Sequence, residues 1–140
     1  MADRLLKVRL VTPDRILVDK AAEAVEIPGK SGYFEVFYGH APLLSGIRAG
    51  ELRIHGGEAG EQRYVIAHGF VEVLPERVTI LTETARKPEE IDTSAAVELL
   101  QRGETMRSEA GNDPAKFARA GALIAEAEAL LEAAGAGKKA

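Results

Sequence analysis

The side chains best suited to chemistry in this sequence are three histidines. His40 stands in a Gly-His-Ala-Pro segment that predicts a loop, His55 precedes a Gly-Gly pair, and His68 precedes Gly69. Their spacings of 15 and 13 residues fit no local metal-binding motif. We interpret His55 and His68 as hydrogen-bonded residues at strand ends. For His40 a structural role and an interface role stay open, since loops often carry recognition residues.

The remaining polar residues favour no enzymatic mechanism. The pair Glu89-Glu90 and the glutamates Glu126, Glu128 and Glu132 fit a solvated face. The serines lack the strand–turn–helix context of a nucleophile, and the glycines are spread over several turns instead of forming a phosphate loop. The chain has no cysteine, which excludes thiolate metal sites. We therefore expect a protein that is not an enzyme and that has no cofactor and no bound metal.

Composition narrows the classes of partner. The 140 residues are 46% hydrophobic and 29% charged, as in a soluble globular protein, and the net charge of −4 argues against nucleic acid. The N-terminal MADRLLKVRLV is too charged for a signal peptide. No run approaches the roughly 20 apolar residues of a membrane span. We expect the chain to be cytosolic, or to be peripheral to a membrane by way of another protein.

Residues 1–86 are predicted to form a mostly antiparallel β domain. In Leu6–Leu10 apolar residues alternate with basic ones, which is typical of a strand with one buried face. Short β-prone runs with a turn signal about every 8 to 12 residues favour a sandwich or barrel. No helical stretch interrupts them, which argues against βαβ units. The expected strands are 6–10, 23–27, 33–37, 43–47, 51–55, 64–67, 70–74 and 78–82.

Residues 87–140 are predicted to form an α-helical hairpin. Asp92 is suited to cap a first helix, and Asp113-Pro114 to begin a second one of about 21 residues that Gly135 ends. Residues at helical spacing define one contact face on each helix. The face of the first helix contains Ala96, Leu99, Gly103 and Met106, and that of the second contains Phe117, Ala120, Ile124, Ala127, Leu131 and Ala134. Because these faces hold few large side chains, the pair is marginal alone. We expect it to dock on the β domain or a partner and to be able to undock.

The order of the motifs resembles that of one protein family. The segments IPG-x-x-G-x-F, GHAPLL, G-x-L-R-I and GFVEV-x-P-x-RVTIL-x-x-TA, with EID opening the hairpin, are similar to the epsilon subunit of bacterial F-type ATP synthases over essentially the whole chain. The resemblance implies an α+β fold, with an antiparallel β-sandwich of about ten strands and a two-helix antiparallel hairpin. It also implies a non-catalytic rotor subunit of the central stalk. Such a subunit couples proton translocation to ATP synthesis and can restrain ATP hydrolysis through its hairpin.

The resemblance further implies contact residues and partners. By position, the turn formed by Lys30, Ser31, Gly32 and Tyr33 and the loop around His40 would face the ring of c subunits and the foot of the gamma subunit. One face of the sandwich would pack on gamma, and an extended hairpin would reach the catalytic beta subunit. The complex would hold the chain at the cytoplasmic face of the bacterial plasma (inner) membrane. Nucleic acid would play no part.

The chain departs from the family pattern in its β domain. The family usually has Gly where Glu35 stands, Pro where Tyr38 stands, and a second Gly where His68 stands. Because Pro limits the freedom of a loop and Gly permits positive φ, the loop before His40 is expected to differ in shape.

A second departure concerns nucleotides. Some members bind ATP through an I/L-D-x-x-R-A motif, of which this chain keeps Ile91 and Asp92 but has Ala95 in place of the arginine. A phosphate thereby loses a charge-assisted contact of about 1.5–3 kcal/mol. We expect this degenerate motif to bind ATP weakly or not at all.

Two other functions compete with that of a rotor subunit. The chain could be a regulator whose hairpin clamps a small molecule such as a nucleotide, against which Ala95 counts. It could also be an enzyme that uses His40 with an acidic neighbour, for which a second reactive group is lacking. Within the rotor interpretation, the glutamates of the last helix predict only modest electrostatic support for an extended, inhibitory hairpin.

Overall fold

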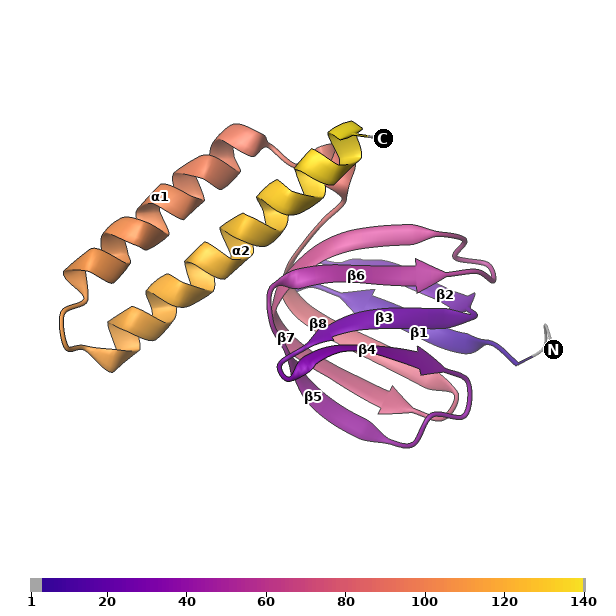
Figure 1. Cartoon of the computed structure of the whole chain (residues 1–140). Helices are drawn as coiled ribbons and strands as arrows, with labels where there is room; N and C mark the ends of the chain where they lie inside the picture. The colour runs from indigo at the N-terminus through magenta and orange to yellow at the C-terminus, as the bar shows by residue number, and fades with distance from the viewer. Residues whose placement is uncertain (1–3, 140) are drawn as a thin grey trace. The chain divides into compact units, whose positions relative to one another are not determined.

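The computed structural model describes residues 4–139 and divides the chain into two compact units, Met1–Ala85 and Arg86–Ala140 (Figure 1). The first unit holds the strands, and the second holds a short 3-10 helix followed by two α-helices. The predicted fold class, a β-sandwich followed by a helical hairpin, is confirmed.

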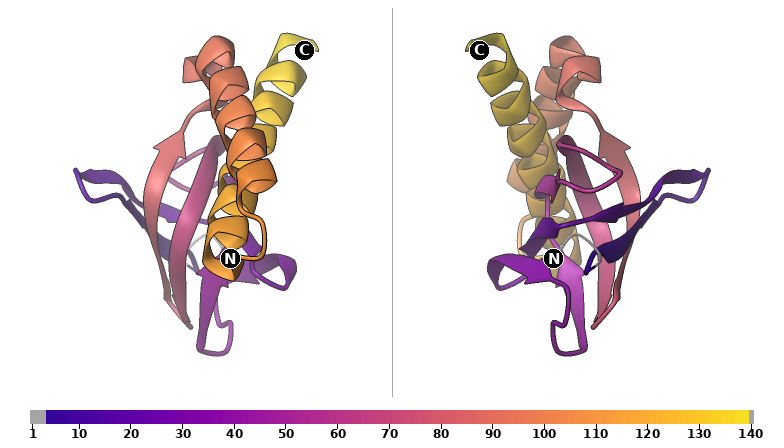
Figure 2. Two further views of the ribbon diagram at one scale, coloured as in Figure 1. Left: turned by 90° about the vertical axis from the view of Figure 1, so that its left-hand side faces the viewer. Right: turned by 90° about the vertical axis from the view of Figure 1, so that its right-hand side faces the viewer.

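The strands of the first unit form one sheet that folds over on itself. They are β1 (Leu6–Val11), β2 (Ile16–Ala22), β3 (Ala24–Gly29), β4 (Gly32–Phe37), β5 (Leu43–Ile47), β6 (Gly50–His55), β7 (Gln62–Leu74) and β8 (Arg77–Arg86). Their order is β2-β1-β8-β7-β5-β3-β4, and β6 pairs with β3 and β7 in the same row as β5. In Figure 1, β6, β3 and β4 lie in front of β1, β2 and β8, as the two layers of a sandwich, and Figure 2 shows the same strands from two sides.

The pairing of the strands is mostly antiparallel, as expected. The exception is β1 with β8, which run parallel with Val8 opposite Val78 and Leu10 opposite Ile80. These four side chains are fully buried. Because the side chains of a strand alternate between its faces, the exposed Lys7 and the buried Val8 follow directly from the alternation predicted for β1.

Every strand contributes to the interior of the sandwich, mostly with aliphatic side chains. β4 and β5 contribute one buried side chain each, Val36 and Ile47. Each fully buried side chain of this kind stabilises the fold by about 1.5–3 kcal/mol. The core contains Leu6, Val8, Leu10, Val18, Ala22, Val25, Ile27, Val36, Ile47, Leu52, Ile54, Tyr64, Ile66, Val71, Val73, Val78 and Ile80.

The strand count differs from the expectation in two places. The structure has eight strands among the described residues, not about ten, and β2 was not predicted. The predicted strands 64–67 and 70–74 are one strand, β7, which runs through His68 and Gly69. His68 takes a positive φ of 62°, and a Cβ on Gly69 would collide with the carbonyl oxygen of Leu81. The chain therefore kinks at these two residues without ending the strand.

The second unit begins with η1 (Pro88–Glu90), followed by α1 (Thr93–Glu109) and α2 (Pro114–Lys139). Both predicted caps are confirmed: the Asp92 carboxylate accepts a hydrogen bond from Ala95 N, and that of Asp113 accepts from Ala115 N. The prediction that α2 ends at Gly135 was wrong. Gly135 is not among the residues with the positive φ that closes many helices, and α2 continues to Lys139.

The two helices meet through small side chains. Ala96 and Gly103 are buried in α1, and Ala120 and Ala127 are buried in α2, as their spacing predicted. Phe117, which was expected on the same face, is 55% exposed. No helix in residues 4–139 is both long enough and apolar enough to cross a membrane.

Candidate protein-docking surface

The first predicted contact segment is the turn between β3 and β4. Lys30 and Ser31 are exposed and form the turn itself, and Gly32 follows with a φ of 132°, a conformation that favours glycine. The Tyr33 hydroxyl accepts a hydrogen bond from Glu51 N at 2.8 Å, while 56% of the Tyr33 surface stays exposed. The turn is thus anchored to β6 and leaves an aromatic ring exposed.

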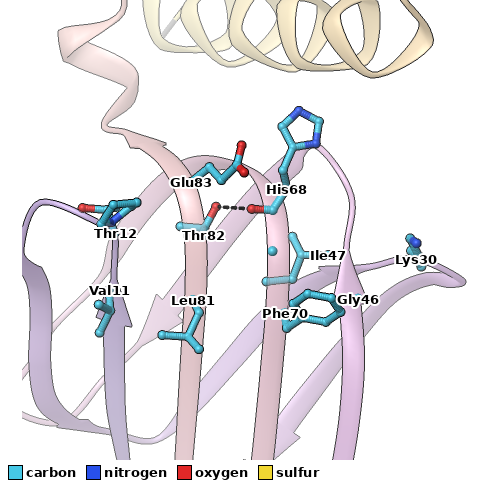
Figure 3. Close-up of a pocket in the computed structure, with 12 residues that line it drawn as sticks. Val11, Thr12, Lys30, Gly46, Ile47, His68, Phe70, Leu81, Thr82 and Glu83 are labelled. Carbon is cyan, nitrogen blue, oxygen red and sulfur yellow. Dashed lines mark hydrogen bonds between the residues drawn. The ribbon is translucent and has the colours of Figure 1, made fainter. Parts of the chain in front are cut away.

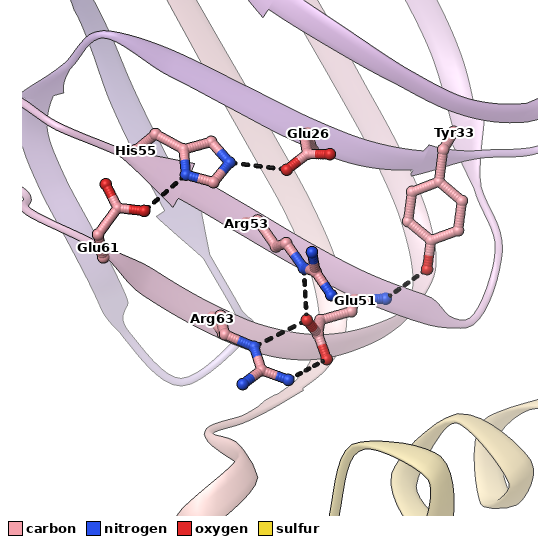
Figure 4. Close-up of polar contacts among 7 residues, drawn as sticks. All are labelled: Glu26, Tyr33, Glu51, Arg53, His55, Glu61 and Arg63. Atoms are coloured by element: carbon pink, nitrogen blue, oxygen red, sulfur yellow. Dashed lines mark hydrogen bonds and ion pairs between the residues drawn. The ribbon is translucent and has the colours of Figure 1, made fainter. Parts of the chain in front are cut away.

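Charged side chains hold the neighbouring part of β6 in place. Glu51 accepts two hydrogen bonds from the Arg63 guanidinium, at 2.8 and 2.9 Å, and one from Arg53 Nε at 2.7 Å (Figure 4). The hydrogen bond from Arg63 is the main cause that lowers the pKa of Glu51, with Arg53 adding to it against the opposing effect of burial. Glu51, whose backbone N anchors Tyr33, is therefore held as a carboxylate.

The second predicted segment is the loop that contains His40. Gly39 N donates to Pro75 O at 2.6 Å, which ties the loop to the turn between β7 and β8. His40 N donates to Phe37 O at 3.2 Å, and His40 Nδ1 donates to Ala41 O at 2.6 Å. In the described part of the chain, the ring of His40 is thus paired with a backbone carbonyl and not with an acidic side chain.

The structure does not bring these two segments together. The turn Lys30–Tyr33 includes the first two residues of β4, and the His40 loop follows the last one, so they lie at opposite ends of a six-residue strand. At about 3.3 Å per residue they are separated by roughly 20 Å. Their role at an interface stays a prediction, and they would form two contact points on one partner surface or touch two partners.

A row of exposed apolar side chains crosses the outer face of four strands. Ile16 of β2 pairs with Val11 of β1, and Val11 pairs with Leu81 of β8. Phe70 of β7 lies beside Leu81 in the wall of one groove (Figure 3). Ile16 is 52% exposed, Leu81 51% and Phe70 59%, and Val11 is half-buried. We call Ile16, Val11, Leu81 and Phe70 the apolar row.

Sequence reasoning missed this row although a signal was present. Val71 and Val73 are buried, so the alternating positions 70 and 72 of β7 must face outward. In the same way, the buried Ile80 and Thr82 place residue 81 outward on β8. An apolar residue out of phase with the buried face of its strand is the signal, and both Phe70 and Leu81 satisfy it.

The apolar row borders an open groove of about 630 Å³. Ile47 and Gly46 of β5 line it beside Phe70, and Lys30 and Glu83 stand at its margin (Figure 3). Lys30 N donates to Gly46 O at 3.0 Å, which fixes the start of the turn against the groove. An apolar floor with charged residues at its edge is suited to receive side chains of another protein.

The degenerate nucleotide motif, Ile91 and Asp92, lies at the start of α1, where Asp92 stabilises the helix. Asp92 caps α1 through its bond to Ala95 N at 3.2 Å, Ile91 is half-buried, and Ala95 is exposed. A carboxylate that caps a helix is oriented toward backbone amides. Nucleotide binding by these residues stays a prediction.

These features define an α+β protein whose sandwich offers an apolar face for docking. Residues 5–88 match the family described as ATP synthase, Delta/Epsilon chain, beta-sandwich domain. The ATP synthase epsilon chain of Koribacter versatilis is 46% identical over 105 residues, which cover 74% of this chain and 72% of the relative. That of Moorella thermoacetica is 38% identical over 133 residues, 94% of this chain and 97% of the relative. The chain therefore belongs to the ATP synthase delta/epsilon family.

Solved structures share the fold over most of the chain. A chain of the Euglena gracilis mitochondrial ATP synthase, solved with its OSCP, F1 and c-ring parts, superposes with a TM-score of 0.76 at 24% identity, covering 93% of this chain and 81% of that one. A chain from the central stalk and c-ring of the Tetrahymena thermophila mitochondrial enzyme gives a TM-score of 0.65 at 14% identity, covering 92% and 96%. At these identities the likeness concerns the fold.

Proposed function

We propose that this chain is a non-catalytic rotor subunit of the central stalk of a bacterial F-type ATP synthase, which couples proton translocation to ATP synthesis. Membership of the delta/epsilon family supports the proposal, as does the fold shared with chains of ATP synthase structures. The single observation that carries it within this chain is the apolar row. Exposed apolar surface that spans several strands is typical of a protein interface.

We assign the apolar row to the gamma subunit. A rotor part has to stay attached while torque passes through it, and a continuous apolar contact with charged margins provides that attachment. Lys30, Ser31, Gly32 and Tyr33 are assigned to the c ring, and the His40 loop to the foot of gamma. We propose that the complex holds the chain through these contacts on the cytoplasmic face of the inner membrane.

Copurification with gamma tests the assignment. Phe70→Asp and Leu81→Asp place a charge in the apolar row, and we expect each to weaken binding to gamma by about thirtyfold or more, as buried hot-spot residues do. Phe70→Leu is the matched control, because it keeps the apolar surface and should retain binding. Circular dichroism checks that the exposed substitutions leave the fold intact. Unchanged binding by both aspartate variants would contradict the assignment to gamma.

We further propose that the hairpin restrains ATP hydrolysis only modestly, through an extended state that reaches the catalytic beta subunit. Lys116 and Arg119 near the start of α2 are exposed, but the second half of the helix carries Glu126, Glu128 and Glu132. Truncation after Lys87 in the assembled enzyme is expected to raise hydrolysis by no more than about twofold, because less than about 0.5 kcal/mol of restraint is lost. A many-fold rise would identify the hairpin as a strong brake.

A further inference from the structure

A second cluster of ionisable side chains lies on strands that take no part in the apolar row. Glu26 of β3, Glu35 of β4 and His55 of β6 each offer one ligand atom, and these atoms lie within 4.8 Å of one another. Glu26 pairs directly with Glu35 across β3 and β4, and His55 pairs with Ala24, two residues before Glu26. The three side chains therefore share one face of the sheet.

The two glutamates of this cluster repel each other. Like charges directly opposite on neighbouring strands destabilise a sheet unless a cation lies close to both. Arg53 is opposite Glu26 in register, but its Nε donates to Glu51 at 2.7 Å. Among the residues that the structure describes, the carboxylate of Glu35 takes part in no hydrogen bond or ion pair. Within residues 4–139, the cation that is hydrogen-bonded to this acidic pair is His55, through Glu26.

The imidazole of His55 is held in an orientation that suits a metal ligand. Its Nδ1 lies 2.7 Å from Glu61 Oε1, and its Nε2 lies 2.7 Å from Glu26 Oε2 (Figure 4). The other carboxylate oxygen of Glu61 accepts from Gly56 N at 3.0 Å, which fixes Glu61 itself. A carboxylate on one ring nitrogen and a ligand position at the other is the usual arrangement around histidines that bind metals.

A proton and a metal ion would compete for the same nitrogen of His55. The hydrogen bond to Glu61 is the largest cause that raises the pKa of His55, and the hydrogen bond to Glu26 is the second. The protonated ring donates to both carboxylates. A divalent ion bound to Nε2 would displace that proton and would bring a second positive charge between Glu26 and Glu35.

We propose that Glu26, Glu35 and Nε2 of His55 bind a divalent first-row transition-metal ion such as Zn²⁺, with Glu61 orienting the imidazole from outside the ligand set. An imidazole nitrogen with carboxylate oxygens is a donor set that suits Zn²⁺, whereas Mg²⁺ and Ca²⁺ take oxygen ligands. Three protein ligands leave a position for water. The ion would clamp β4, an edge strand, to β3 and β6.

Isothermal titration of the full chain with zinc chloride, without an affinity tag and slightly above neutral pH, tests the site. We expect saturable binding of one ion per chain and no comparable binding of magnesium chloride. Glu35→Gln should weaken zinc binding by about tenfold or more. Because Glu35 is exposed and bonds to no described residue, this variant should fold normally. Glu72→Gln, an exposed glutamate of β7 opposite Leu44, is the matched control and should bind as the parent chain does.

The outcomes separate a metal site from an imidazolium that merely bridges two carboxylates. Absorption bands of bound Co²⁺ that disappear in His55→Asn and persist in His40→Asn support the ligand set. Lack of saturable zinc binding by the parent chain would overturn the proposal, and so would equal binding by Glu35→Gln. Zinc binding that is lost in His40→Asn or His68→Asn would place the ion elsewhere and would also overturn it.

Discussion

Gly103 of α1 lies directly against Ile124 of α2. A Cβ at residue 103 would come within 2.8 Å of Ile124 Cγ1 and 3.2 Å of Ile124 N. Glycine in the interior of a helix costs about 1 kcal/mol relative to alanine, and here the close approach of the two helices explains its presence. The hairpin is thus held by backbone proximity where its alanine-rich faces offer little side-chain area.

We predict that Gly103→Val destabilises the hairpin by about 1–3 kcal/mol, because the added atoms have to displace both the side chain and the backbone of Ile124. Gly121→Ala in α2 is the matched control. Apart from its chain neighbours and the backbone of its own helix, no heavy atom lies within 4 Å of the added Cβ at residue 121, so this variant should stabilise the helix by about 0.5–1 kcal/mol. Denaturant unfolding followed by helical circular dichroism measures both. If both variants changed the free energy of unfolding in the same direction, the close approach of the two helices at Gly103 would not explain the result.

His68 gives a second prediction, since it is the one non-glycine residue with positive φ in the described part of the chain. A bulky residue in this conformation is strained by about 1 kcal/mol or more. His68→Gly is expected to relieve that strain and to raise the free energy of unfolding by up to about 1 kcal/mol. His68→Ala loses the same side-chain contacts but keeps the strain, so it should be less stable than the glycine variant. Urea denaturation of both variants measures how much the backbone strain at residue 68 lowers the free energy of unfolding. Equal stability would exclude strain at this position.

The parts of the fold that depend on neighbouring residues could be predicted from the sequence. The alternation in Leu6–Leu10 identified β1, and Asp92 and Asp113 identified the starts of both helices, because a cap acts within three residues. β2 was missed because its sequence ILVDKAA does not alternate regularly. β7 was predicted as two strands because Gly69, after His68, is a residue typical of strand ends, whereas the strand continues through both residues.

The contacts between distant strands could not be predicted in the same way. The parallel pairing of β1 with β8 brings Val11 beside Leu81, seventy residues later in the chain, and local periodicity does not encode such a pairing. The same holds for His55, which meets Glu26 of β3 and Glu61 of the loop before β7. The predicted interface residues Lys30–Tyr33 and His40 lie in turns that neighbouring residues determine. The sequence therefore predicted that these segments are turns, but it did not predict which strands surround them.

Glu51 gives a prediction for the pH dependence of stability. Its pKa is lowered from an ordinary value of 4.5 in the folded state, chiefly by the hydrogen bond from Arg63. The unfolded state therefore binds a proton on Glu51 more readily, and the stabilisation is fully present above the unfolded pKa and is lost as pH falls through the folded one. We expect Glu51→Gln to lower the free energy of unfolding at neutral pH, and the difference from the parent chain to shrink below pH 4.5. Denaturant unfolding across this acid range measures it.

The control for this prediction is Glu83→Gln, an exposed glutamate of β8. Because Glu83 takes no part in the ion pairs of Glu51 with Arg63 and Arg53, Glu83→Gln should not lower the free energy of unfolding at neutral pH as Glu51→Gln does. If the difference between Glu51→Gln and the parent chain stayed constant down to the most acid pH tested, the ion pairs with Arg63 and Arg53 would not be the source of the stabilisation.

Substitutions of Asp92 distinguish a role in capping α1 from a role in binding a nucleotide. Asp92→Ala removes the acceptor for Ala95 N and is expected to lower the stability of α1 by about 0.5–2 kcal/mol. Asp92→Asn keeps a capping oxygen and should be nearly neutral, because asparagine caps helices about as well as aspartate. Without an arginine at position 95, a phosphate lacks its charge-assisted partner, so calorimetric titration with ATP should give no micromolar binding for the parent chain or either variant. Micromolar binding by the parent chain that Asp92→Asn abolishes would show instead that the carboxylate serves the nucleotide, and that the hairpin carries a ligand site in spite of Ala95.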